Sequence, residues 1–225
     1  NSVHQAGMMS LAEAELMEVV IKSGCLGNVM GCESIKPQSR ETMRQGVNRR
    51  DGGAQYKEVI ERLRRWGLQT CAAFTLGHDT DTLRSIGATY RFALKNKFCF
   101  AAYNILMPYP GTELYDQLKA EGRLLYGGKW WLHPQYRFNY AAFVPKNMSA
   151  DALTQASFWC RRNFNSLSSV LYRLFEPRTN LRNPFRFISY LLYNPVFRRE
   201  VFEKQGMVFG YEQATDEDTA DSALG

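Results

Sequence analysis

The sequence repeats one pattern three times: an amphipathic helix followed by a short apolar strand. Strands that alternate with helices of this length pair in parallel through right-handed crossovers. The sequence therefore predicts an α/β protein, either an open doubly wound sheet or part of a (β/α) barrel. The predicted helices lie near 11–21 and 54–66 and from 83 onward, with a further one near 113–121, and the strands near 25–31, 70–76 and 98–107.

A polar turn follows each predicted strand. Glu33 and Ser34 follow the first strand, 77–82 the second and 108–112 the third. Because the carboxyl ends of parallel strands meet at one edge, we expect the three turns to lie together and the chemistry to lie there.

Composition and length indicate one globular domain with an appendage. The chain has 225 residues, 45% of them hydrophobic, and a formal net charge of +6. We expect a core domain over 1–128, a mostly helical extension over 129–210 and a disordered acidic tail over 211–225. Within the extension, an apolar stripe from Leu153 to Leu174 predicts one long helix that Ser149 caps.

The chain has neither an apolar run of membrane-spanning length nor a leader peptide, so a soluble, cytoplasmic protein is expected. The five cysteines form no CxxC pair, which predicts reduced thiols and no metal site on this chain alone. The chain begins with Asn1 rather than Met and runs at once into a helical pattern, so we expect a piece of a longer protein.

Several motifs together resemble the second half of a radical S-adenosylmethionine (SAM) enzyme. The likeness is strongest to the cobalamin-binding-domain subgroup, which includes hopanoid-methylase-like proteins. Motifs in register on successive strand ends are together more specific than any one of them alone. They are Gly24-Cys25, Gly-Cys-Glu-Ser at 31–34, the turn at 77–82, Pro-Tyr-Pro-Gly-Thr-Glu-Leu-Tyr at 108–115, Glu-Gly-Arg at 121–123 and Trp130.

The resemblance implies the C-terminal half of a partial (β/α)6 barrel, with three βα units, and then the helical extension. The family's C-x3-C-x2-C loop holds a [4Fe–4S] cluster, and it is absent from this sequence. The resemblance therefore implies that the missing N-terminal half is the partner of this chain and that the chain alone is inactive. A parent that carries cobalamin would methylate an unactivated carbon of an apolar, lipid-like small molecule.

The resemblance also suggests roles for individual residues. The Glu33 carboxylate or Ser34 would bind the SAM ribose or its amino-acid end, since a carboxylate accepts hydrogen bonds from two hydroxyls. The segment 74–77 would flank the adenine, and Leu106 and Pro108 would offer backbone groups to it. The cofactor-binding residues are thus Glu33, Ser34, Phe74, Leu76, Gly77, Leu106 and Pro108, with Asn104, Tyr109 and Trp130 nearer the substrate. No catalytic residue is assigned.

Simpler interpretations stay open. Asp79, Asp81 and Thr82 can cap the helix that begins near Leu83, and Trp130 can be a core residue. The chain can also be a non-catalytic module that binds a nucleotide or a partner, an inactive truncation, or a (β/α) enzyme without a cluster. The aromatic and basic C-terminal part is also compatible with contact to a membrane surface, although a solvated helix face is favoured. No nucleic-acid partner is expected.

Overall fold

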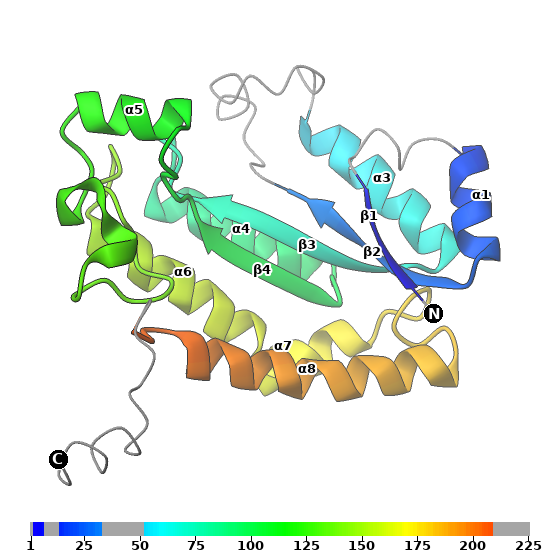
Figure 1. Cartoon of the computed structure of the whole chain (residues 1–225). Coiled ribbons are helices and arrows are strands. Elements are labelled where there is room, and N and C mark those ends of the chain that lie inside the picture. The colour runs from blue at the N-terminus through cyan, green and yellow to red at the C-terminus, as the bar shows by residue number, and fades with distance from the viewer. Residues whose placement is uncertain (1, 7–13, 33–51, 209–225) are drawn as a thin grey trace, which may run out of the picture.

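The computed structural model describes residues 2–6, 14–32 and 52–208, and their centre is a parallel β-sheet. Its four strands are ordered β1-β2-β3-β4, and a helix follows each strand along the chain (Figure 1). The strands are β1 (Ser2–Ala6), β2 (Cys25–Gly31), β3 (Gln69–Leu76) and β4 (Phe100–Ile105), and the helices are α1 (Ala14–Lys22), α3 (Gly52–Trp66), α4 (Leu83–Lys95) and α5 (Glu113–Ala120).

This topology confirms the predicted α/β class with parallel strands. The sequence predicts three strands, and the described sheet has a fourth, β1, at its edge. The strand was missed because its five residues, SVHQA, are too few and too polar to show a strand pattern. The number of units in a complete barrel stays a prediction.

Alternating residues of β3 divide the sheet into two faces. On the face that α3 and α4 cover, here called the helix face, Ala72, Phe74 and Leu76 are buried. The Phe74 ring stacks on Tyr103 of β4 with centroids 5.3 Å apart, and Ile60 of α3 belongs to the same core cluster. Burial of large apolar side chains on this face is the main stabilisation of the sheet.

On the opposite face, here called the second face, the side chains near the strand ends are small. Gly31, Ala73 and Ala102 lie side by side in register, and Thr75 lies beside Asn104. All five are at least partly exposed.

The extension packs on the sheet through α6 (Ala150–Phe164) and α8 (Pro184–Lys204), with α7 (Leu167–Leu174) between them (Figure 1). Helix α6 lies against β4 and α4, and its Ser157 Oγ donates a hydrogen bond to the Tyr103 carbonyl at 3.0 Å. None of the described helices is long and apolar enough to cross a bilayer.

The prediction of one helix over 149–174 is wrong. The helix ends at Phe164, and a new one begins after Ser166, whose hydroxyl accepts a hydrogen bond from the Ser169 amide at 3.3 Å. The apolar stripe does not continue into one core, since Leu167 is 69% exposed and Leu171 is 56% exposed. Serine caps a helix start well, and here that local preference interrupts the long periodic pattern.

A buried arginine connects α7 to the start of β4. The Arg173 side chain is fully buried, and its Nη1 donates to the carbonyls of Phe98 and Cys99 at 3.0 and 2.6 Å. Its Nη2 donates to Phe164 O and Asn194 Oδ1, which brings the end of α6 and the middle of α8 to the same point.

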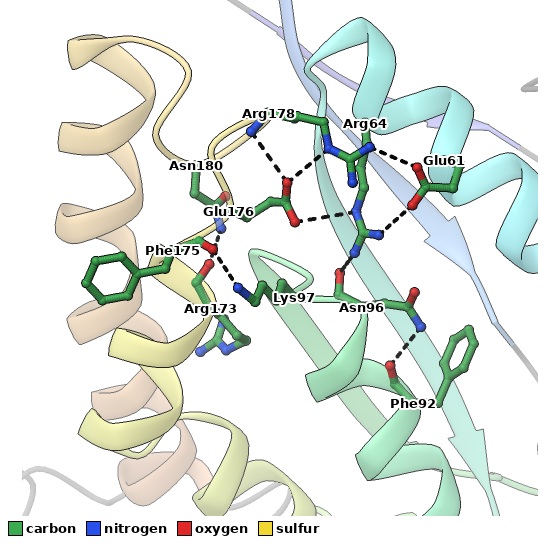
Figure 2. A network of polar contacts seen from close by, with 10 residues as sticks. All are labelled: Glu61, Arg64, Phe92, Asn96, Lys97, Arg173, Phe175, Glu176, Arg178 and Asn180. Carbon is green, nitrogen blue, oxygen red and sulfur yellow. Dashed lines mark hydrogen bonds and ion pairs between the residues drawn. The ribbon is translucent and has the colours of Figure 1, made fainter.

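Ion pairs then hold the α7–α8 loop against α3 (Figure 2). Arg178 Nη1 lies 2.9 Å from Glu61 Oε2, and Arg64 Nη1 lies 2.9 Å from Glu61 Oε1. Glu176 lies between the two arginines, at 3.8 Å from Arg64 Nε and 3.4 Å from Arg178 Nε. In the same network, the Lys97 ammonium donates a hydrogen bond to the Phe175 carbonyl. The loop between α7 and α8 thus makes polar contacts with both α3 and the loop that precedes β4.

Candidate functional site

The candidate site is the second face at the carboxyl ends of β2, β3 and β4. Thr75 and Asn104 are neighbours there, and Gly31, Ala73 and Ala102 form the floor beside them. Among the described residues, neither the Thr75 hydroxyl nor the Asn104 amide has a side-chain hydrogen bond. A hydroxyl and an amide both donate and accept, so together they suit the polar edges of a nucleoside. The small floor lets a flat ring approach the backbone.

The predicted cofactor residues on β3 are Phe74 and Leu76, and Thr75 lies between them in the predicted segment 74–77. The structure places the side chains of Phe74 and Leu76 on the helix face, where they are 1% and 2% exposed. Only their backbone could meet a ligand on the second face. The alternation of side chains along a strand already indicates this, because it puts Thr75 and Phe74 on opposite faces of the sheet.

Gly77 follows β3 in a left-handed conformation with φ +102°. A Cβ added there would lie 2.7 Å from Leu153 Cδ2 and 3.3 Å from Phe143 Cζ. The structure thus explains this glycine by its packing against α6 and the loop before it, without a ligand.

The turn after β3 is held by hydrogen bonds to the side chains of Asp81 and Thr82. Asp81 Oδ2 accepts hydrogen bonds from the amides of Gly77 and His78 at 3.0 and 3.1 Å. Thr82 is the N-cap of α4 and forms a capping box with Ser85. The capping interpretation is therefore confirmed for Thr82, whereas Asp81 binds the amides of the turn before the helix and accepts no hydrogen bond from an α4 amide. His78 is buried, and its Nε2 has no hydrogen-bond partner within the described part of the chain.

Asp79 has a different role from its neighbours. Its Oδ1 lies 2.8 Å from Arg123 Nη2, and its Oδ2 lies 2.8 Å from Lys146 Nζ. Burial alone would raise the pKa of Asp79, but the hydrogen bonds and charges of these two cations outweigh it, and the pKa is lowered. Arg123 also pairs with Glu121 at 2.6 Å, so the Glu-Gly-Arg motif serves to hold the β3 turn against the extension.

The turn after β4 rests on an aromatic cluster. The Trp130 indole donates to the Pro108 carbonyl at 3.2 Å, and Trp130 itself is 5% exposed. Tyr109 contacts Trp130 edge to face at 5.9 Å but is 57% exposed. Leu106 donates its amide to the Leu76 carbonyl at 2.8 Å, which continues the β3–β4 pairing. Trp130 is therefore a core residue that positions the turn, and Tyr109 is available on the surface.

Two predicted cofactor residues, Glu33 and Ser34, lie outside the described residues. Their roles stay predictions, as do those of the other candidate site residues. Asn104, suggested above for the substrate side, is exposed on the second face directly beside Thr75.

The described residues contain no group of three His, Cys, Asp or Glu side chains that could hold a metal ion. All five cysteines are free, and burial raises the pKa of the Cys71 thiol to about 11 and that of Cys160 to about 12. Neither of these two thiols belongs to a group of three such side chains in the described part of the chain. No step of a reaction is therefore assigned to a cluster on these residues.

Comparison with known proteins gives relatives named as methyltransferases. The chain is 27% identical over 167 residues to bacteriochlorophyllide d C-12(1)-methyltransferase of Chlorobaculum tepidum, across 74% of this chain and 35% of that protein. It is 29% identical over 113 residues to the C-8(2)-methyltransferase of the same organism, across 50% of this chain and 24% of that protein. An uncharacterised methyltransferase of Pyrococcus horikoshii is 29% identical over 104 residues, across 46% of this chain and 22% of that protein.

The chain thus spans about a third or less of the length of these curated relatives. No protein-family model matches it. Among solved structures, Elp3 of Methanocaldococcus infernus aligns with a TM-score of 0.48 and 12% identity, across 72% of this chain and 41% of that one. At this score the likeness carries no argument about fold or function.

Proposed function

We propose that this chain forms one wall of the SAM site of a radical SAM methyltransferase. The observation that carries the proposal is the similarity to a named methyltransferase over 74% of the chain. The motifs that resemble radical SAM enzymes support the reaction class, and the parallel strands support the position of the site at their carboxyl ends. The finer assignment to the cobalamin-binding, hopanoid-methylase-like subgroup, with a lipid-like substrate, rests on the resemblance alone.

In this proposal SAM, when bound beside a reduced cluster, supplies the methyl group and the radical chemistry. The residues of this chain bind and orient SAM. Ala73 and Ala102 let the adenine lie close to the strands, while Thr75 and Asn104 hydrogen-bond its polar edges. The cluster, and cobalamin in a parent that uses it, would be held by residues outside this chain.

The proposal has a direct genetic test. The coding sequence upstream of Asn1 is expected to encode a C-x3-C-x2-C loop about three βα units earlier. An in-frame stop codon close to Asn1 would contradict the enzyme proposal and favour a non-catalytic module.

The site itself is tested by calorimetric titration of SAM into the gene product that contains this chain. Asn104→Ala is expected to weaken SAM binding about tenfold, the effect of one lost hydrogen bond of about 1.4 kcal/mol. Asn163→Ala is the matched control, because Asn163 lies on α6, where its amide donates to the Trp159 carbonyl. Equal affinity for SAM in all three proteins would remove Asn104 from the site. Glu33→Ala is expected to weaken binding in the same titration.

A further inference from the structure

A cavity of about 470 Å³ lies between the second face and α8, near the starts of the strands. Val29, Cys71 and Phe100 line it from the sheet, and Phe185, Tyr193 and Phe197 line it from α8. The Phe100 ring contacts the Phe197 ring with centroids 4.5 Å apart and the Tyr193 ring with centroids 6.3 Å apart, so these rings connect the sheet to α8 at one wall of the cavity. Its volume and its mostly apolar lining are those of a site for a small apolar molecule.

A second cavity, of about 200 Å³, adjoins the first and differs in charge. The two share Cys71, Phe100 and Phe197 in their walls. The smaller cavity is lined in addition by two cations, Arg161 and Lys204, and by Glu200, which lies 3.2 Å from Lys204.

Arg161 is the cation without a counterion. Among the described residues it has no ion pair, and its Nη1 donates a hydrogen bond to Gln205 Oε1 at 3.2 Å. The Arg161 side chain is partly buried, and this burial lowers its pKa. An anion that occupied the cavity would offset the cost of burying a charge that has no ion pair among the described residues.

We propose that the two adjoining cavities bind an amphipathic acid, with its aliphatic body in the larger cavity and its carboxylate against Arg161. The walls are thus apolar at one end and cationic at the other, as such a molecule requires. The smaller cavity adjoins the site proposed for SAM, because Ala102 lines both. The larger cavity lies toward the starts of the strands, where Cys71 precedes Thr75 by four residues, about 13 Å along β3.

The test is calorimetric titration of dodecanoate, with 1-dodecanol as a neutral probe of equal chain length, into the full 225-residue chain without SAM. Dodecanoate is expected to bind at one site and more tightly than dodecanol. Arg161→Met is expected to weaken dodecanoate binding by tenfold or more and to leave dodecanol binding unchanged. Arg162→Met is the matched control, since Arg162 is exposed on the same helix and lines neither cavity.

A second pair of variants tests the position of the aliphatic body. Cys71→Trp fills the wall that the cavities share, and Ser189→Phe fills the larger cavity from α8 without altering the sheet. Each is expected to abolish binding of dodecanoate, with circular dichroism as the check on folding. Binding that either folded variant leaves unchanged would overturn the location, and equal affinity for acid and alcohol would overturn the role of Arg161. Because SAM is absent from these titrations, the result does not depend on the SAM proposal.

Discussion

The two faces of the sheet use the same strands for different purposes. On the helix face Phe74, Leu76 and Tyr103 are at most 2% exposed and pack in one cluster. On the second face, one residue along each strand, Thr75 and Asn104 retain exposed polar atoms. Alternate residues of one strand therefore serve different purposes. Those on the helix face stabilise the fold by packing, and those on the second face can be substituted with little loss of stability.

The largest expected effect is on the helix face. Phe74→Ala removes a ring that contacts Tyr103 and Phe92, and it leaves a cavity in the core. We expect the free energy of unfolding to fall by about 3–5 kcal/mol, as measured by urea denaturation. A loss below about 1 kcal/mol would mean that the two faces do not differ as described.

A medium effect is expected where the extension joins the β3 turn. Asp79→Asn removes the charge that pairs with Arg123 and Lys146, at an expected cost of about 1 kcal/mol at neutral pH. Because the folded-state pKa of Asp79 is lowered, this stability is present above its ordinary pKa of 3.8 and is lost as the pH falls through the folded-state pKa.

The measurement is the thermal unfolding midpoint of the two proteins as a function of pH. The difference between wild type and Asp79→Asn is expected to be constant near neutral pH and to shrink in acid. A difference that grew as the pH fell would show that Asp79 is not stabilised in its charged form.

The smallest effect on stability is expected on the second face. Thr75→Val keeps the shape and the β-branched side chain and replaces only the hydroxyl with a methyl group. The free energy of unfolding should therefore change by about 0.5 kcal/mol or less. SAM affinity of the gene product should nevertheless decrease about tenfold in calorimetry. A variant that lost stability while it kept its SAM affinity would reverse the assignment of the two faces.

Much of the fold could be predicted from the sequence because local patterns determine it. Strands β2, β3 and β4 and the helices between them follow from apolar runs and helical periodicity. Strand β1 was missed because five mostly polar residues carry no period. The break at Ser166 could not be predicted, because the helical spacing of apolar residues continues across it. Only the structure shows that Leu167 and Leu171 are exposed and do not extend the core.

For the candidate site, the sequence could predict which strand ends carry polar turns but not the surroundings of the individual residues. The strand ends do carry the polar turns, yet Asp81 is occupied in closing one turn, Thr82 caps α4, and Phe74 and Leu76 point into the core. The role of Arg173 could not be predicted, since its acceptors at Phe98 and Cys99 are more than 70 residues away in sequence. The domain boundary near 128 and the acidic tail stay predictions, the latter outside the described residues.

One contact has a consequence for the order in which the molecule assembles. Arg186 near the start of α8 donates a hydrogen bond to the Leu26 carbonyl at the start of β2, 160 positions earlier. A ribosome must therefore have reached Arg186 before this contact can form, and contacts of such long range slow folding. Until α8 docks, the apolar starts of the strands stay uncovered, and the nascent chain is most prone to aggregate during that interval.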